Sequence, residues 1–194
     1  NRNCIVLYKL RRAGILLLIG IINICCSSPG KRVPFTVRES AMGVELLENE
    51  LPVFFYQRKQ TSNTDTAAFN NYLHPLYDLK GDTLTEEFPE DHPHHRGIFW
   101  AWHQLYVNDS SVGDGWMMKD FSMDVINANT TMEAENAHLD TYVLWKSSAF
   151  ENGKPFVEEH TSIVVYPKQA DSRKIDFEIS LKALVPGVEI GGSD

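Results

Sequence analysis

Alternating hydrophobic and polar positions dominate the chain after residue 32, and they predict β-strands rather than helices. The clearest case is 174–184, where every second residue is apolar: Ile175, Phe177, Ile179, Leu181 and Ala183. A period of two buries one face of a strand and leaves the other in water. No comparable helical periodicity appears after residue 32.

Several shorter segments repeat this strand pattern, and turns separate them. Further strands are expected at 44–56, 72–77, 98–107, 139–145 and 157–166, the first of them divided by a turn at 48–50. Turns or loops are expected at 60–71, 78–81, 108–116 and 151–154. Many strands joined at short intervals predict an all-β fold, an antiparallel sandwich or barrel.

The first 32 residues have a different character. Lys9, Arg11 and Arg12 precede an apolar run at 13–24, which is shorter than the roughly 20 residues that cross a bilayer. A basic segment followed by a short apolar one predicts an export signal. Two cysteines and a Ser-Ser-Pro-Gly tether follow the apolar run. The whole segment resembles a bacterial lipoprotein signal, in which Cys25 or Cys26 would carry the lipid.

This division gives a signal and tether at 1–32 and one β-sandwich domain at 33–194. We expect a periplasmic protein or an outer-membrane lipoprotein that touches the membrane only through its lipid anchor. An uncleaved anchor and simple secretion are the alternatives. All three cysteines lie in the first segment, so the domain has no disulfide.

Charge excludes one class of partner. Residues 1–25 hold four basic side chains and no acid, so acids outnumber bases by 26 to 14 in the remainder. Such a surface repels phosphate backbones and argues against nucleic acid as a partner.

The domain has enough hydrophobic residues to form a core, because 43% of the chain is hydrophobic.

Candidate chemistry is concentrated at 89–102, which holds three of the seven histidines, an arginine and two of the four tryptophans. Imidazole titrates nearest neutral pH, and a neighbouring carboxylate can orient it. Arginine is a permanent cation that can bind a carboxylate or a pair of hydroxyls. The candidate catalytic residues are therefore Asp91, His92, His94, His95 and Arg96.

Aromatic residues next to the histidines suggest a binding surface. If 98–102 is extended, Trp100 and Trp102 share one face and form a platform of the kind on which sugar rings stack. His74, Asp114 and Trp116 complete the candidate substrate-binding set. We expect these imidazoles and indoles to line one pocket. The alternative is a solvated histidine loop beside tryptophans that belong to the core.

Other kinds of site find less support. His92 and His94 have the spacing of metal ligands on an extended chain, but no glutamate follows within the next few residues. Arg96 lies there instead, and a cation beside a metal is unfavourable, so we predict no metal. The domain has no cysteine, no Gly-x-Ser-x-Gly elbow and no phosphate-binding glycine loop, and we predict no cofactor.

Three segments carry a resemblance to a known family: 72–77, 88–103 and Gly113-Asp-Gly-Trp116. Together they resemble the bacterial family of unknown function DUF6807, often labelled methane oxygenase-like or PmoA, over roughly residues 40–194. The family normally continues past Gly-Gly-Ser-Asp194, so we expect a chain truncated at its C-terminus. Its members resemble galactose-mutarotase-like β-sandwiches and often occur as exported proteins of polysaccharide-degrading bacteria.

The resemblance implies mutarotase-like acid/base chemistry on a carbohydrate. His94 or His95 would be the acid, and Arg96 would anchor hydroxyls. The carboxylate partner would be Glu159 or a residue beyond Asp194, although Glu158 and Glu159 are otherwise expected on a solvated strand face. The predicted function is an exported lipoprotein that binds a carbohydrate and acts on it. The alternatives are a non-catalytic glycan-binding or structural lipoprotein and the metal-dependent oxygenase that the label implies.

Overall fold

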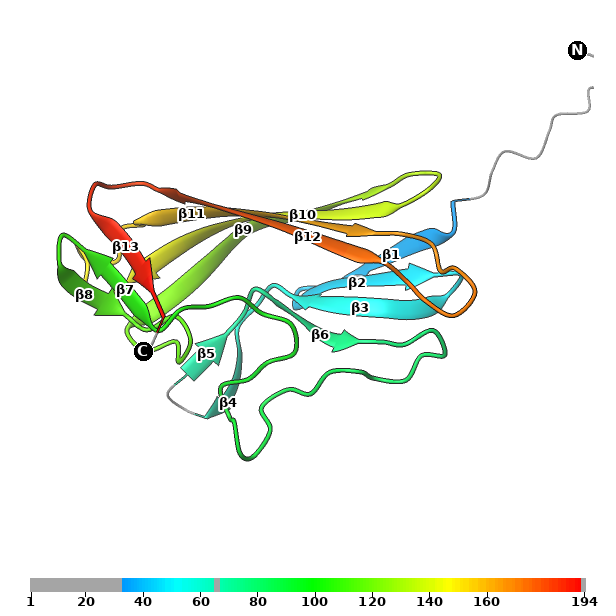
Figure 1. Cartoon of the computed structure of the whole chain (residues 1–194), viewed down its shortest axis with the longest axis horizontal. Coiled ribbons are helices and arrows are strands. Elements are labelled where there is room, and N and C mark those ends of the chain that lie inside the picture. Colours follow the sequence, from blue (N-terminus) through cyan, green and yellow to red (C-terminus); the bar gives the residue numbers. More distant parts are fainter. Residues whose placement is uncertain (1–32, 65–66, 193–194) are drawn as a thin grey trace, which may run out of the picture. The chain divides into compact units, whose positions relative to one another are not determined.

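The computed structural model describes residues 33–64 and 67–192, of which 62–64 and 67 are described by their backbone alone (Figure 1). Every regular element in these ranges is a β-strand, and the strands pair antiparallel, which confirms the predicted all-β class. No helix in the described part of the chain is long and apolar enough to cross a membrane. The predicted signal and lipidation cysteines lie outside the described residues.

Two four-stranded sheets form the main layers (Figure 1). The first has the order β1-β2-β3-β6, and its strands are β1 Phe35–Glu39, β2 Gly43–Glu48, β3 Leu51–Gln57 and β6 Tyr72–Leu76. The second has the order β12-β11-β10-β9, and its strands are β9 Phe121–Met132, β10 Ala137–Ser147, β11 Val157–Val165 and β12 Ile175–Ala183.

Two smaller sheets complete the fold. The first contains three strands in the order β13-β7-β8, namely β7 Gln104–Val107, β8 Ser110–Gly113 and β13 Val188–Gly191. The other is the pair β4 Thr61–Thr64 and β5 Ala67–Phe69.

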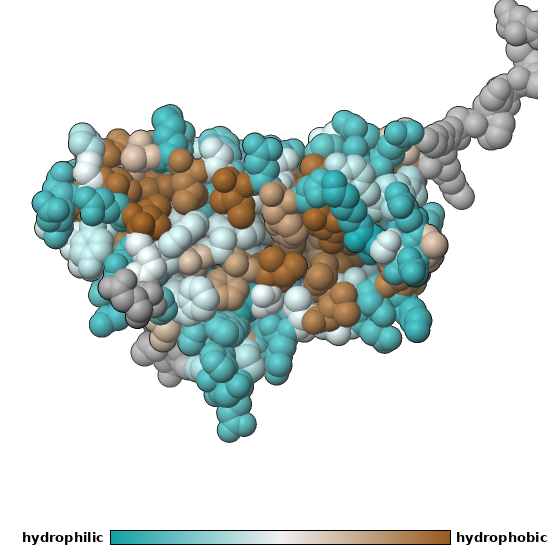
Figure 2. Space-filling view, viewed as in Figure 1, coloured by the Kyte–Doolittle hydropathy of each residue, from teal (hydrophilic) through white to brown (hydrophobic). Residues whose placement is uncertain are grey.

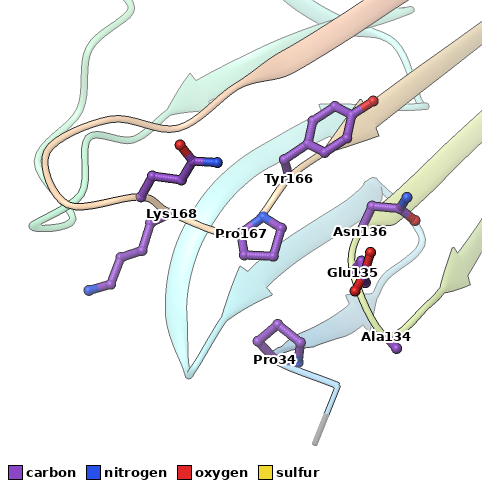
Figure 3. Close-up of a pocket in the computed structure, with 8 residues that line it drawn as sticks. Pro34, Ala134, Glu135, Asn136, Tyr166, Pro167 and Lys168 are labelled. Carbon is purple, nitrogen blue, oxygen red and sulfur yellow. The ribbon is translucent and has the colours of Figure 1, made fainter. Parts of the chain in front are cut away.

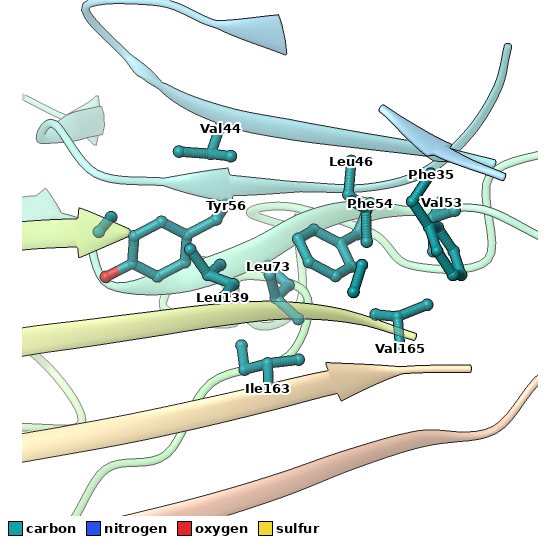
Figure 4. Packing of buried hydrophobic residues seen from close by; sticks show 12 residues of the cluster. Phe35, Val44, Leu46, Val53, Phe54, Tyr56, Leu73, Leu139, Ile163 and Val165 are labelled. Atoms are coloured by element: carbon teal, nitrogen blue, oxygen red, sulfur yellow. The ribbon is translucent and has the colours of Figure 1, made fainter. Parts of the chain in front are cut away.

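The long β9–β12 sheet covers two separate apolar cores, which makes the fold a β-sandwich. One end of this sheet packs on the β1-β2-β3-β6 sheet through a core that includes Phe54, Leu73, Leu139 and Ile163 (Figure 4). Its other end packs on β7 and β8 through a second core, which includes Leu105, Val112, Val143, Trp145 and Phe156. Strict alternation of buried residues along β10 and β11 supplies the inward face of the sheet.

Between the two cores, the inward face of β10 and β11 becomes polar. Thr141, Glu159 and Thr161 are all buried there, and Glu159 is fully inaccessible. The Glu159 carboxylate accepts hydrogen bonds from Asn71 Nδ2 at 2.9 Å, Trp145 Nε1 at 2.8 Å and Thr161 Oγ1 at 3.0 Å. A buried charge is tolerated when such donors surround it. Because Asn71 precedes β6, this contact joins the two layers.

Most predicted strands are confirmed. The segments 139–145, 157–166 and 174–184 correspond to β10, β11 and β12. The segment 44–56 is the β2–β3 hairpin, whose turn places Asn49 and Glu50 at φ 50° and 69°. Two left-handed residues are typical of tight hairpin turns. The strand at 72–77 is β6.

Other predictions were wrong. The expected loop at 60–71 contains β4 and β5, and the loop at 108–116 contains β8. The strand expected at 98–107 is reduced to β7, while Ile98 forms an isolated bridge with Leu73. Strand β9 was missed because a bulge opposite Tyr142 and Val143 shifts its register and interrupts the alternation.

Strand β12 buries its apolar face only in part. Ile175 and Phe177 pack against the first core and Leu181 against the second, whereas Ile179 is 38% exposed. This exposure arises because β12 is the edge strand and has a neighbour on one side only. Hydrophobic residues accordingly reach the surface along the course of β12 (Figure 2).

The buried carboxylate gives a first prediction. Replacing Glu159 with Ala removes the acceptor of three buried hydrogen bonds, at a cost of roughly 1–3 kcal/mol for each bond. We expect the free energy of unfolding, measured by urea denaturation, to fall by about 3 kcal/mol or more. Glu158→Ala is the matched control, because Glu158 faces outward on the same strand and pairs with Lys182 at the surface. Equal losses in the two variants would contradict this role for Glu159.

Candidate functional site

The histidine-rich segment folds into a hairpin, here called the histidine hairpin, that spans residues 86–97. Its two sides are joined by backbone bonds from Gly97 N to Glu86 O at 2.9 Å and from Phe88 N to His95 O at 2.8 Å. Two further backbone-bonded turns close its tip. The hairpin therefore presents its histidines from a backbone held by its own hydrogen bonds.

Gly97 attaches this hairpin to β6. Its φ is +66°, and a Cβ atom there would lie 2.2 Å from the carbonyl oxygen of Leu73 and 2.9 Å from His74 Cβ. The next residue, Ile98, exchanges two backbone hydrogen bonds with Leu73, each 3.0 Å long. Only glycine permits both the left-handed conformation and this close approach.

Arg96 lies beneath the histidines rather than among them. It is 1% exposed, and its Nη1 donates to the carbonyl oxygens of His94 at 3.0 Å and Trp116 at 3.3 Å. Its guanidinium also lies 4.2 Å from the centre of the Phe99 ring, a cation–π contact. Burial lowers the pKa of Arg96 to about 10, so it remains a cation at neutral pH.

This burial corrects the role expected for Arg96. Anchoring the hydroxyls of a substrate requires an accessible guanidinium, and 1% exposure does not provide one. The same contacts give Arg96 a different role, because they hold the backbones of His94 and Trp116 together. Arg96 is thus a positioning residue.

Trp116 is the centre of an aromatic cluster. Its ring lies 5.9 Å from that of His94, 5.7 Å from His95, 5.3 Å from His103 and 5.2 Å from Phe99, measured between centroids. The His95 ring also stacks on the His92 ring, with 4.7 Å between the ring centroids and an angle of 20° between the ring planes. We call this set the histidine–tryptophan cluster, and its members are His92, His94, His95, Phe99, His103 and Trp116.

His103 is held by Asp114, a contact that sequence reasoning missed. His103 Nδ1 lies 2.9 Å from Asp114 Oδ2, and Asp114 Oδ1 accepts backbone hydrogen bonds from Trp116 and Met117, both at 2.9 Å. A carboxylate bound to Nδ1 fixes the tautomer and leaves Nε2 to exchange a proton. A hairpin in the sequence could have indicated this contact. A turn at 108–109 places His103, just before β7, opposite Asp114, just after β8.

The local environment lowers the pKa of His94. Its partial burial is the largest cause, and the neighbouring charges of His95, His92, Arg96 and His103 act in the same direction. His94 is therefore neutral at neutral pH, where an imidazole can accept a proton. The hairpin tip is more open, with His92 and Asp91 both exposed and 3.0 Å apart.

The remaining predicted residues lie elsewhere. The Trp102 ring packs 5.9 Å from that of Trp145 against the second core, and in the described part of the chain no ring contact joins Trp102 to Trp100. The predicted two-indole platform is therefore absent among these residues, because 98–103 is not a strand. His74 Nδ1 contacts Thr85 Oγ1 at 3.0 Å.

Glu159 does not serve as the carboxylate partner of the histidines. The prediction that it lies on a solvated face is wrong, since it is fully buried and its bonded partners are Asn71, Trp145 and Thr161. In the cluster itself, Asp114 contacts His103 and Asp91 contacts His92. Within 33–64 and 67–192, no group of three His, Cys, Asp or Glu residues is arranged to hold a metal ion.

A depression of about 490 Å³ lies away from this cluster (Figure 3). It is formed where the turn between β9 and β10 meets the segment after β11 and the residue before β1. Tyr166, Pro167 and Asn136 are among the residues that line it, and none of the predicted site residues does.

These features define a class of protein: an antiparallel β-sandwich with a cluster of imidazoles around one indole. The chain belongs to the family of unknown function DUF6807, whose model matches residues 43–194. This confirms the family expected from the sequence, while its description names no activity and leaves the methane-oxygenase label a prediction. No curated protein and no solved structure matches the chain.

The close approach at Gly97 gives a second prediction. We expect Gly97→Ala to lower the free energy of unfolding by about 2 kcal/mol more than Gly153→Ala does. Gly153 is the matched control, because its φ is +84° but a Cβ there meets nothing within 4 Å. Subtracting the two values, each measured by urea denaturation, separates the clash with Leu73 from the cost of positive φ. A difference near zero would show that the hairpin does not depend on this approach.

Proposed function

We propose that this protein is an exported, lipid-anchored β-sandwich that binds a carbohydrate at the histidine–tryptophan cluster and opens and closes its hemiacetal. The observation that carries the proposal is the contact of one indole, Trp116, with three imidazoles. Two of them have different environments, since His94 has a lowered pKa and His103 is bound to Asp114. Such a pair suits proton transfer in both directions.

The proposed reaction needs one base and one acid. The base takes the proton from the anomeric hydroxyl while the acid protonates the ring oxygen, so the bond from the anomeric carbon to the ring oxygen breaks and a carbonyl forms. Reversal of both transfers on the other face of the carbonyl closes the ring as the opposite anomer. His94, which the resemblance makes an acid, is instead the proposed base, because its lowered pKa leaves it neutral. The proposed acid is the protonated form of His103, which holds Asp114 through Nδ1 and gives the proton on Nε2 to the ring oxygen.

The aromatic residues provide the binding surface in this proposal. Apolar faces of sugar rings pack on indole and imidazole rings, whose N–H groups bond to hydroxyls at the rim. Trp116 and His95 are half-buried, so part of each ring is accessible to a ligand. The loss of either ring should therefore weaken binding more than it alters the reaction.

A panel of monosaccharides tests the proposal through two measurements, ligand-induced thermal stabilisation and the rate of anomer exchange by NMR. We expect His94→Ala to slow exchange by about 100-fold or more while stabilisation by ligand is kept. Trp116→Ala should reduce the stabilisation itself. His160→Ala is the control, because this exposed residue lies on the outward face of β11 and outside the cluster.

Two outcomes would contradict the proposal in different ways. Stabilisation by sugars without any exchange in the wild type would leave a glycan-binding lipoprotein and remove the acid/base reaction. A complete lack of stabilisation by every sugar in the panel would remove the carbohydrate.

The membrane anchor is proposed from residues 1–32, which lie outside the described residues. The basic segment, the apolar run and the adjacent Cys25 and Cys26 are its support. Metabolic labelling with a palmitate analogue in a Gram-negative host should label the wild type, and only one of Cys25→Ser and Cys26→Ser should abolish the label. Equal labelling of the double variant and the wild type would exclude lipidation at this pair.

A further inference from the structure

The buried cation beneath the cluster has no carboxylate partner among the described residues. Within residues 33–64 and 67–192, Arg96 forms no ion pair, its Nη1 donates only to backbone carbonyl oxygens, and its buried Nε has no hydrogen-bond partner. Buried charges in proteins are normally paired, because a low-dielectric interior disfavours an isolated ion. In the described part of the protein the charge of Arg96 is therefore offset by carbonyl oxygens and by the rings of Phe69 and Phe99, and not by a carboxylate.

None of the nearby acids in the described residues pairs with Arg96. Glu87, in the same hairpin, accepts a hydrogen bond from the hydroxyl of Tyr72. Asp114 bonds to His103, and Asp91 lies beside His92 at the exposed tip. Glu86 and Glu90 are exposed to solvent.

Four basic groups lower the pKa of His94 through their charges. They come from the hairpin itself and from the segment that precedes β7, and they are His92, His95, Arg96 and His103. The guanidinium of Arg96, which has no carboxylate partner in the described residues, and any imidazole that becomes protonated above it favour an anion at this site. They do so although the formal charge of the whole chain is −8 and Asp91 and Asp114 contact two of the imidazoles. The attraction is local, because salt screens charges farther away than about 10 Å.

We propose that the ligand of the histidine–tryptophan cluster is an anionic saccharide, one whose ring carries a carboxylate or a sulfate ester. This inference rests on the proposed carbohydrate site and specifies its substrate class. The anionic group lies over His95, next to the proposed base His94, where it supplies the counter-charge that Arg96 lacks. The sugar ring then packs against Trp116.

Binding of an anion should be coupled to proton uptake. In the free protein, burial and basic neighbours lower the pKa of His94, and a bound anion opposes the effect of these neighbours and raises that pKa. The complex consequently holds more protons than the free protein in the range below the ordinary imidazole value of 6.5. Affinity for the anionic sugar should therefore increase as pH falls into this range.

Matched sugar pairs test the inference on the full chain in detergent. Calorimetry compares glucose with glucuronic acid, galactose with galacturonic acid, and glucose with glucose 6-sulfate. We expect the anionic member to bind at least about tenfold more tightly, and more tightly at about pH 6 than at about pH 8. The carboxylate and sulfate arms distinguish the two possible anionic groups.

Two variants link the preference to the cluster. Arg96→Met should abolish the preference for the anionic member, and thermal unfolding shows whether the variant is folded. His95→Gln, which changes a half-buried residue, should reduce the preference several-fold without depending on the fold of the Arg96 variant.

The outcomes separate this inference from the proposed function. Equal affinity for both members of every pair overturns the anionic ligand and leaves the carbohydrate site intact. Binding of neither member overturns both. Acetate or inorganic sulfate binding as tightly as the acidic sugars would also overturn the inference, because it would show a simple anion site that does not recognise the saccharide ring.

Discussion

The architecture depends on one buried carboxylate. Glu159 lies between two apolar cores, where it accepts hydrogen bonds from Trp145 and Thr161 in its own sheet and from Asn71 in the facing layer. Tyr56 donates to Asn71 in turn, at 2.8 Å. A polar belt of this kind has to be satisfied completely, since any misplaced layer leaves buried donors unpaired. It therefore sets the register of the two layers more strictly than apolar contacts do.

The position of the candidate site follows from that junction. Asn71 leads into β6, and Leu73 in β6 pairs with Ile98, immediately after Gly97 closes against the same strand. Arg96 then joins the hairpin to the segment that carries Trp116. Each step is a short, directional contact. The imidazoles are consequently brought to one indole by a continuous series of hydrogen bonds that begins in the interior.

The same arrangement gives the site its electrostatic character. Partial burial, together with the neighbouring basic groups that include Arg96, lowers the pKa of His94 and keeps it neutral at neutral pH. His103, by contrast, has a carboxylate on one ring nitrogen. In the proposed function, two imidazoles in unlike surroundings beside one indole carry out the proton transfers, and the cation below them selects an anionic ligand. Arg96 would then contribute both to the stability of the hairpin and to the choice of ligand.

The sequence by itself determined the all-β class, the strands at 139–145, 157–166 and 174–184, and the place of the histidines, because alternation and residue type are local properties. It also carried the family resemblance, which the match over residues 43–194 confirms. Only the tertiary structure decided which side chains meet: Trp116 with the imidazoles, Trp102 with the core, Asp114 with His103, and Glu159 with Asn71. These pairings join residues distant in sequence, and a bulge in β9 and an irregular segment at 98–103 remove the periodicity on which local reasoning depends.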